Sequence, residues 1–556
     1  MKEFLGKLGR RLTGRKGIGG TMTAVIIIAV VMLNILAYTV TNAFGLYIYS
    51  PPKRDFSLSG STDELFKSAL DGGKKVKITF CYPEETLETH STGSDVLNTA
   101  KQFQEKYPEL IELRFINLLT RTDVTKGSDS FGDRVDLDRY ASVVCSNKSE
   151  NGKACGYTMR YVDAEKSAKC TKCGGAIDPD KDVSYNYRQN TIIFECGDGE
   201  EFSYRVLTDN SSSAGFVDFY TLDSTATIVA YNGEEVMASM ISWVLHKDHP
   251  VAYFTQNHGE TADIAFTNLL TCAGYYVEVI NLRKQEIPAD AGMIIISNPT
   301  TDFDRAAEGS ATRGELDKIE DYLVNKGGKL YVALDPYVKK LSNLEHTLAK
   351  WGIEFAGAEN ENGTHVREIV REDVNAITPD GYSFVARHAD NDIAGQIRFK
   401  VERYGKDSIL VSEVNRLNLN SELGAQPLLV SSGTSSAYAG GTKTDGEGGY
   451  AVSAYSQQKH TDGKTSTIFV IPTAYITATD AFQSENYSNK DFIYSTLEVL
   501  FESHPTPRGC NQVLYTSGVL ENLTMGKARL YTAIILAVPT ALAVLGIITL
   551  RRRKNR

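Results

Sequence analysis

Four of the eight cysteines lie close together in the sequence and could place four thiolates around one ion: Cys145, Cys155, Cys170 and Cys173. The second pair stands in KCTKCGGAI, where two thiols two residues apart, followed by glycines, form a tight knuckle that directs both sulfurs at one metal ion. The first pair is irregular, with nine residues between its cysteines. We expect a structural Zn²⁺ in a ribbon-like insertion over residues 143–187, with disulfides or free thiols as the alternatives. Catalytic zinc is not expected, because four thiolates leave no open coordination position.

The other four cysteines are expected to be single buried thiols of the core. They are Cys81, Cys196, Cys272 and Cys510. Cys81 is followed by Tyr-Pro and has no second thiol two residues later, which a dithiol exchange reaction needs. We therefore expect no redox chemistry from Cys81.

A second group of polar residues stands where apolar, β-branched runs end between Val251 and Pro336. The group comprises Asn257, His258, Glu260, Asn298 and Asp335. Because ligands bind beyond the carboxyl ends of the strands in open parallel sheets, these positions mark an expected ligand or partner site. His258 and Glu260, in the motif NHGE, could ligate a metal or exchange a proton, but no third ligand follows at a firm spacing. A strand-to-helix turn in which both side chains cap the helix and bond to loops explains the motif better.

No set of residues for catalysis emerges from the remaining motifs. The turn after MIIIS offers Ser297 without the flanking glycines that expose a nucleophile. No Gly-rich loop with a lysine, of the kind that holds phosphates, follows a strand. The net charge of −10 argues against a nucleic-acid binder. We expect a protein that is not an enzyme and does not bind nucleic acid.

The elements that position the second group form two expected regions. Residues 251–336 alternate short apolar runs with helical segments, which is typical of βαβ units and a parallel sheet. Gly327 and Gly328 are expected to end one of these helices. Residues 360–505 are expected to complete this sheet, with a strand at His365–Arg371 and a closing helix at Asp491–Ser503. Residues 431–450, which are rich in glycine, serine and threonine, are expected to be a flexible loop without regular structure.

The region before residue 225 has its own βαβ pattern, which indicates a small α/β domain with a thioredoxin-like order. Its expected elements are a helix over Thr62–Leu70 capped by Ser59 or Ser61, strands at Lys75–Tyr82 and Ile111–Leu118, and a helix at Val96–Glu109. Residues 225–248 are expected to form one helix, in which Trp243 packs between the two regions.

Two long apolar runs stand near the ends of the sequence. Residues 22–49 and 529–550 are long enough to cross a membrane as helices, and their apolar stretches carry no acidic or basic side chain apart from Arg529 at the edge of the second. A basic head, residues 1–21, and a basic tail, residues 551–556, flank them. The positive-inside rule therefore predicts that both termini are cytoplasmic. Two domains, 50–224 and 225–510, and a linker, 511–528, are then extracytoplasmic.

The order of several motifs resembles the GldG-like family of auxiliary subunits of ABC transport systems, named for gliding motility and including an intraflagellar-transport-type module. The motifs are YFTQNHGE, CAGYYVEVINL, IPADAGMIIISNP, YLVNKGGKLYVALDP, LAKWGIEF and NYSNKDFIYSTLEVL. The resemblance implies a membrane-anchored α/β protein whose central domain is similar to flavodoxin or class I glutamine-amidotransferase folds. It also implies an ABC permease and a cytoplasmic ATPase as partners.

On this resemblance we expect a non-catalytic subunit whose ectodomain binds a ligand or a partner. No cysteine matches the nucleophile of the amidotransferases, which favours binding over catalysis. Two alternatives are an extracytoplasmic hydrolase or amidotransferase-like enzyme that uses His258 and Glu260, and a cell-envelope scaffold without cargo.

Overall fold

The computed structural model describes residues 56–515 and Arg551, apart from residues 149–154, 162–163, 165–166, 171–172, 180, 185–189, 208–218, 223–226, 308–312, 360–363, 374–375, 445, 447 and 485. The chain divides into two compact units, Met1–Asp55 and Phe56–Arg556, and all described residues belong to the second. No helix within the described ranges is long and apolar enough to cross a membrane. Both apolar runs, residues 22–49 and 529–550, lie outside these ranges, as do the basic head and residues 552–556.

The fold is mixed α/β, with parallel and antiparallel strands, and its first part is built on a five-stranded sheet of order β3-β2-β1-β7-β8. The strands are β1 (Val76–Phe80), β2 (Ile111–Asn117), β3 (Thr122–Asp123), β7 (Ile192–Cys196) and β8 (Ser203–Leu207). β1 runs parallel to β2 and antiparallel to β7. We call residues 56–245, which contain this sheet, the N-terminal sheet region. It confirms the expected strands at 75–82 and 111–118.

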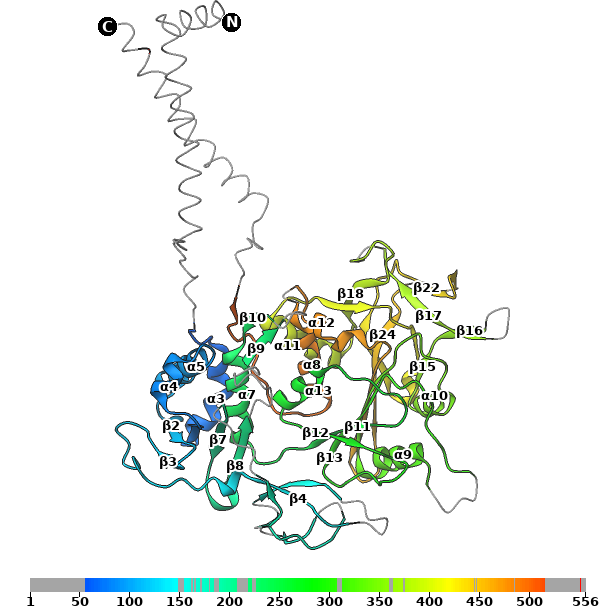
Figure 1. Ribbon diagram of the computed structural model, residues 1–556. Coiled ribbons are helices and arrows are strands. Elements are labelled where there is room, and N and C mark those ends of the chain that lie inside the picture. Colours follow the sequence, from blue (N-terminus) through cyan, green and yellow to red (C-terminus); the bar gives the residue numbers. More distant parts are fainter. Residues whose placement is uncertain are drawn as a thin grey trace, which may run out of the picture. The chain divides into compact units, whose positions relative to one another are not determined.

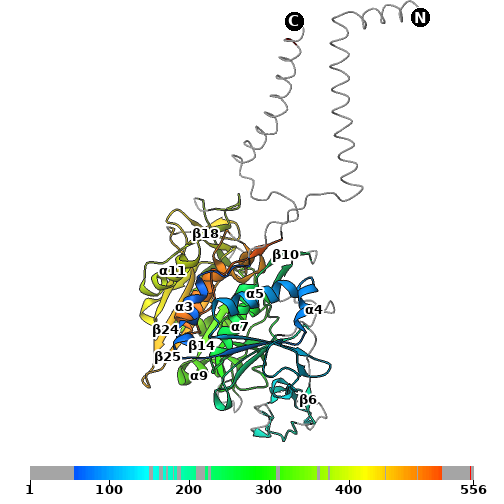
Figure 2. The same ribbon diagram turned by 90° about the vertical axis from the view of Figure 1, so that its left-hand side faces the viewer.

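Helices cover one face of this sheet (Figure 2). They are α3 (Ser61–Asp71), α5 (Gly93–Lys106) and α7 (Gly233–Leu245), with the short α4 (Glu84–Thr89) beside α5. Their apolar sides meet the sheet in one core that contains Phe66, Phe103, Met237 and Trp243. The N-cap position of α3 is Gly60 and not one of the expected serines. Ser59 nevertheless accepts, through its Oγ, the backbone N–H of Ser61 at the start of the helix, at 3.3 Å.

The expectation of a single helix over residues 225–248 was also wrong. Residues Ile228–Tyr231 form β10, which pairs with β9 (Tyr220–Leu222) and with β26 (Val513–Leu514) near the other end of the described chain. The β-branched run before Asn232-Gly233 favours a strand, and that dipeptide separates it from α7. The apolar pattern continues across the break, which is why the sequence suggested one helix.

The second part, residues 251–500, contains an 11-stranded sheet among its described residues, and we call it the central sheet region. β12 (Tyr276–Ile280), β11 (Val251–Thr255), β13 (Ala291–Ser297), β14 (Lys329–Ala333) and β25 (Thr465–Ile471) lie in this order and are all parallel. Antiparallel strands continue the sheet: β24 (Ala451–Lys459), β21 (Ala425–Val430), β18 (Ser383–His388) and β19 (Ile409–Ser412), with β15 (Ile353–Phe355) and β20 (Leu417–Leu419) at its side. Residues after 360 therefore complete the sheet, as expected.

Helices pack on both faces of the central sheet (Figure 1). One face carries α8 (Ile264–Cys272), α11 (Asp392–Tyr404) and α13 (Asn489–Leu500), and the other carries α9 (Glu315–Lys326) and α10 (Ser342–Ala349). The central sheet region also contains the short α12 (Thr479–Gln483) and 3₁₀ turns at Ser421–Leu423 and Tyr475–Thr477. The N-terminal sheet region contains 3₁₀ turns at Asp138–Tyr140 and Gly199–Glu201. α9 ends as predicted, because Gly327 adopts φ of 68°.

Residues 431–450, expected to lack regular structure, contain two strands. β22 (Ser436–Ala439) and β23 (Thr442–Lys443) join β16 (Gly357–Glu359) and β17 (His365–Arg371) in a four-stranded sheet. The buried carboxylate of Glu372 accepts hydrogen bonds from the backbone N and from Oγ of Ser432, at 2.9 and 2.6 Å. Composition alone suggested a loop, whereas this distant carboxylate satisfies two polar groups at the start of the segment.

Both ends of the folded part converge on one carboxylate, that of Glu234 in the first turn of α7, which is 4% exposed. Oε1 accepts hydrogen bonds from the backbone N and Oγ of Ser59, at 2.8 and 2.7 Å. Oε2 accepts from the backbone N of Asn511, at 2.6 Å. The side chain of Asn511 donates in turn to the carbonyl of Ser57, at 2.6 Å. Glu234 therefore fixes the entry and the exit of the folded chain at one place.

We predict that Glu234→Gln lowers the free energy of unfolding by about 1–3 kcal/mol, because the amide can accept at one oxygen only and presents an N–H to the N–H of Asn511. Urea unfolding of the full chain would measure the change. The matched control is Glu109→Gln, an exposed glutamate, which should unfold like the parent protein. Equal stability of the two variants would contradict the role assigned to Glu234.

Candidate metal centre and strand-end site

A β-hairpin brings the first two cysteines together despite their irregular spacing. β4 (Ser142–Val144) ends just before Cys145, β5 (Thr158–Arg160) begins shortly after Cys155, and the two strands pair antiparallel. The backbone N–H of Gly156 donates to the carbonyl of Cys145, at 3.0 Å. β6 (Val183–Ser184) pairs with the other edge of β4. The pairing of β4 with β5 thus brings Cys145 and Cys155 together although nine residues separate them in the sequence.

The second pair sits on the predicted knuckle. Cys170 donates its backbone N–H to the carbonyl of Gly175, at 2.9 Å, and its carbonyl accepts from the backbone N of Gly174, at 2.8 Å. Gly174 adopts φ of 69°, a conformation that favours glycine. This fold places the thiol of Cys173 beside that of Cys170.

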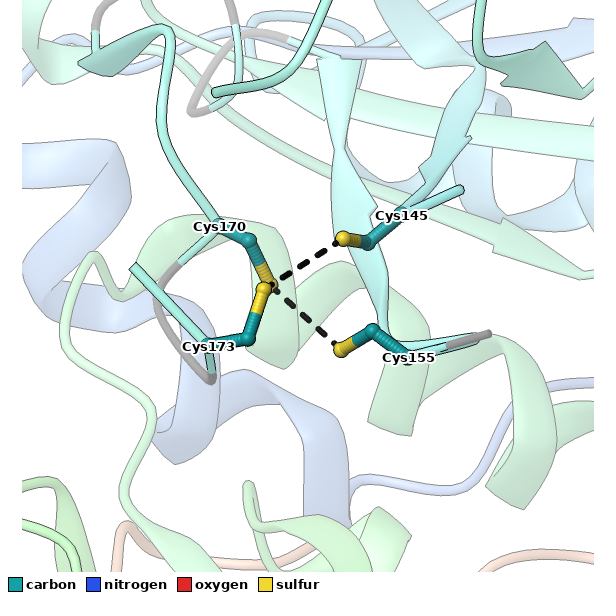
Figure 3. A group of neighbouring side chains, drawn as sticks. All are labelled: Cys145, Cys155, Cys170 and Cys173. Atoms are coloured by element: carbon teal, nitrogen blue, oxygen red, sulfur yellow. Dashed lines mark hydrogen bonds between the residues drawn. The ribbon is translucent and has the colours of Figure 1, made fainter. Parts of the chain in front are cut away.

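The four sulfurs converge on one point, as Figure 3 shows. All four lie within 4.8 Å of one another, and this is the one group of at least three potential metal-binding side chains found in the described part of the chain. Cys145 Sγ is 3.6 Å from Cys173 Sγ, and Cys155 Sγ is 3.9 Å from Cys170 Sγ. Four sulfurs at about 2.3 Å from a tetrahedral ion are about 3.8 Å apart, so the arrangement is compatible with one such ion. All eight cysteines are free, and no pair in the cluster is at disulfide distance.

Asn147 is a member of this cluster that the sequence did not identify. Its Nδ2 donates to Cys145 Sγ at 3.2 Å and to the carbonyl of Ala176 at 2.8 Å, so one amide links the hairpin to the knuckle. The backbone of Gly175 lies so close that an added Cβ would be 2.7 Å from this amide. Hydrogen bonds of this kind orient ligands and stabilise thiolate charge. The only signal in the sequence is an amide residue two positions after a cysteine.

The thiols differ in their surroundings. Cys145 and Cys170 are buried, each 1% exposed, in a small core with Val143 and Met159. Cys173 is exposed, and the backbone N–H of Gly175 lowers its pKa to about 7, with its neighbouring thiols contributing. A thiol with a lowered pKa is readily present as the thiolate that a metal needs.

Of the five strand-end positions, His258 is held most firmly. It is fully buried, its Nε2 lies 2.9 Å from Glu315 Oε1, and its ring stacks on Phe303 with centroids 3.9 Å apart. Its backbone N donates to Glu260 Oε2 at 2.7 Å, and its carbonyl accepts from the backbone N of Thr300 at 2.8 Å. The motif NHGE therefore joins the loop after β11 to the loop after β13 and to the start of α9.

Asn298 and Asp335 form a second contact at the same edge of the sheet. The backbone N of Asp335 donates to Asn298 Oδ1 at 3.0 Å, and Asn298 Nδ2 donates to Thr261 Oγ1 at 3.3 Å. Asn298 has φ of 52° and the exposed Asn257 has φ of 85°. Asparagine tolerates this left-handed conformation better than most residues. The five positions thus lie on neighbouring loops, and Asn298 and Asp335 are in direct contact.

Glu315 is the partner of His258 that sequence reasoning missed. It is 2% exposed and stands at the start of α9, where its Oε2 accepts from the backbone N of Asp304 at 3.1 Å. Arg283 Nε lies 3.5 Å from the same carboxylate. Because 57 residues separate histidine and glutamate, no local spacing could indicate the pair. The hydrogen bond between His258 and Glu315 is buried and joins two segments of the chain. The His258 ring is not exposed to a substrate, so this position does not suit proton transfer.

A cleft of about 1170 Å³ lies between the N-terminal and central sheet regions. One wall is a face of α3 and the other is a face of α11. Its lining includes Leu65, Ser68, Lys74, Phe399, Lys400 and Arg403. Arg403 forms an ion pair with Glu64 across the cleft, and Phe399 is 70% exposed. Nothing in the sequence indicated this cleft, because its two walls are more than 300 positions apart.

We predict that Glu315→Gln lowers the free energy of unfolding by about 1–3 kcal/mol, because the hydrogen bonds around this buried side chain lose their charged acceptor. Chemical unfolding of the full chain would measure the change. Glu354→Gln, an exposed glutamate on β15, is the matched control and should not change stability. A Glu315→Gln variant as stable as this control would show that the bond to His258 contributes nothing.

Comparison with known proteins found no matching family model and no matching curated protein. Among solved structures, one described as "mmIFT52 N-terminal domain" is similar over 45% of this chain and 97% of its own, with 12% identity and a TM-score of 0.33. Another, "Structure of PurLQS from Thermotoga maritima", is similar over 45% of this chain and 98% of its own, with 11% identity and a TM-score of 0.25. Likenesses at these TM-scores carry no inference about function.

Proposed function

We propose that the chain is a non-catalytic auxiliary subunit of an ABC-type transport system, anchored in the membrane at both ends, with its folded region outside the cytoplasm. The observation that carries the proposal is the common attachment of Ser59 and Asn511 to Glu234. A chain that leaves one membrane span and returns to another needs both connecting segments at the same side of its folded part. The apolar runs at residues 22–49 and 529–550, with their basic flanks, supply such spans.

The resemblance of the motifs to the GldG-like family supports a permease and a cytoplasmic ATPase as partners. The order β12-β11-β13-β14 is the order of flavodoxin-like doubly wound sheets, which supports the implied central fold. The N-terminal sheet, with β1 parallel to β2, supports the thioredoxin-like assignment. The sequence has no phosphate-binding loop with its lysine, so ATP hydrolysis belongs to a separate subunit.

The strand-end residues support binding over catalysis. His258 bonds to Glu315 at the start of α9, Glu260 accepts from the backbone N of His258 within their own turn, and Asn298 supports the backbone of Asp335. These bonds give the loops after β11, β13 and β14 a fixed shape, with Asn257 exposed among them. A fixed surface of this kind suits recognition of a partner or cargo, because binding requires little further ordering.

The same proposal includes a structural Zn²⁺ held by Cys145, Cys155, Cys170 and Cys173. Four thiolates saturate a tetrahedral ion, so zinc here would supply cross-links and no chemistry. The strands of this part are short: three residues in β4, three in β5 and two in β6. A core of this size gains little from apolar burial, and a metal offsets that deficit.

We predict that the full-length protein, extracted in a mild detergent, co-purifies with a permease and an ATPase in a fixed ratio. Mass spectrometry of an affinity pull-down from the native cells would measure this. The control bait is the same chain with residues 22–49 replaced by an unrelated membrane span, which should lose the permease. Recovery of the chain alone, under conditions that preserve a known membrane complex, would contradict the proposal and favour the enzyme or scaffold alternative.

We predict that the purified chain contains one zinc ion per molecule and that Cys173→Ser abolishes its retention. Asn147→Ala should weaken zinc binding by roughly 10–100-fold, as loss of a ligand-orienting hydrogen bond does. Asn325→Ala, which removes an exposed amide on α9, is the matched control. Elemental analysis and competition with a chelator would measure both effects. A metal-free protein with disulfides among the four cysteines would overturn the assignment.

A further inference from the structure

Two connections join the N-terminal sheet region to the central sheet region. Residues 246–250 lead from α7 to β11, and residues 501–512 lead from α13 to β26. The first connection carries His246 and His249, and the second carries His504. Three of the nine histidines of the chain therefore stand on these two short segments, which connect the two regions.

The imidazole rings hold the two connections against each other. The rings of His246 and His504 stack, with centroids 4.0 Å apart and planes at 27°. The ring of His249 stacks on Trp243 of α7, with centroids 3.9 Å apart and planes at 11°. The centroids of His249 and His504 are 6.2 Å apart. One stacked cluster thus bridges both connections and the last helix of the N-terminal sheet region.

One nitrogen of each imidazole faces a backbone carbonyl. His246 Nδ1 is 2.8 Å from the carbonyl of Ser242, and His249 Nδ1 is 3.1 Å from that of Gly274. His504 Nε2 is 3.1 Å from the carbonyl of Asp248. Each ring therefore donates its single N–H there in the neutral form, and a second proton must enter at the opposite nitrogen. In His249 this is Nε2, which is buried and has no hydrogen-bond partner among the described residues.

Positively charged side chains on several elements lie near this cluster. The Arg205 guanidinium of β8 lies 4.4 Å from the Trp243 ring and 5.6 Å from the ring of Tyr276 in β12. Lys74, on the loop before β1, donates to the carbonyl of Leu245 at 2.8 Å. Two nearby carboxylates are engaged elsewhere: Glu201 with Lys247, and Glu502 with Lys329. Asp248 stands between His246 and His249 with its side chain exposed.

We propose that this cluster is an acid-sensitive hinge: the neutral rings stack and fix the two sheet regions, and their protonation separates the two connections. The cleft between α3 and α11 ends at this hinge, because Lys74, Leu245 and His246 line it. Protonated rings in contact repel one another and the neighbouring cations, so the cleft widens when the hinge opens. The surface ion pair of Glu64 and Arg403 at the other end of the cleft resists opening only weakly.

The direction of the pH effect follows from the burial of the rings. Burial lowers the pKa of His249 to about 4, with His504 and Arg205 adding to the effect, and burial also lowers the pKa of His246. An exposed histidine has a pKa of about 6.5. The open form therefore binds protons more tightly than the closed form. The stability of the closed form is complete above about pH 6.5 and decreases as the pH falls toward about 4.

Tryptophan fluorescence provides a direct test, since the chain has two tryptophans and one of them contacts the cluster. In the full-length Trp351→Phe protein in lipid nanodiscs, Trp243 is the single reporter. We expect its emission to change reversibly between about pH 7 and about pH 4.5, with a midpoint below the value of a free histidine. Hydrogen exchange, corrected for the intrinsic effect of pH, should become at least about tenfold faster in residues 246–250 and 501–506, and should not change in β13.

Variants separate opening of the hinge from simple quenching by His249. His504→Gln, at a half-buried position, should reduce the change in exchange rate, because one proton-binding ring is lost. His346→Gln, on the exposed side of α10, is the matched control and should behave like the parent. Exchange rates in the two connections that do not change with pH would overturn the proposal. So would an equal acid response in His504→Gln and in the parent protein.

Discussion

The carboxylate of Glu234 is the constraint on which the arrangement of the chain ends depends. Ser59 and Asn511 are 452 positions apart, the difference of their residue numbers, yet both donate backbone N–H groups to it. A buried carboxylate is stable only when such donors surround it, so the two segments and the start of α7 stabilise one another. β26 then pairs with β10, and the Tyr515 hydroxyl donates to Asp95.

Local patterns in the sequence predicted the elements whose structure has a local cause. The Cys-x-x-Cys knuckle at Cys170, the stop of α9 at Gly327 and the parallel strands from Val251 follow from nearby glycines and from runs of β-branched residues. The failures have non-local causes. Ser432 is held by Glu372, 60 positions earlier, and one neighbour of β10 is β26, from near the other end of the described chain. No local periodicity encodes either contact.

At the candidate sites too, the sequence indicated residues within a local pattern and missed contacts between separate segments. The residue types at the ends of the strands indicated their place on the sheet, and His258 does bond beyond its own loop, to Glu315. Glu260 bonds only within its own turn, and the expected helix cap was wrong, because Asp263 caps α8. The partner that defines the role of His258 is Glu315, on a helix that begins far along the chain. In the cysteine cluster, the four thiols were identified by their closeness in the sequence and by the regular spacing of Cys170 and Cys173 alone. Neither signal identified Asn147, because its role depends on the knuckle reaching the hairpin.

The contacts at the strand ends of the central sheet and those of the histidine cluster between the two sheet regions respond differently to pH. At the strand ends, Asn257 and Asn298 adopt left-handed conformations, each at a cost of about 1–3 kcal/mol, and the bonds of Asn298 offset that cost and fix its loop. In the histidine cluster between the two sheet regions, neutral imidazole rings stack and donate hydrogen bonds to backbone carbonyls. One added proton per ring turns stacking between His246 and His504 into repulsion, whereas His258, the histidine at the strand ends, stacks on a phenylalanine that cannot take up a proton. Under the proposed hinge, motion between the two sheet regions originates at the histidine cluster, beside the segment that leads to Glu234, while the strand-end loops of the central sheet keep their shape.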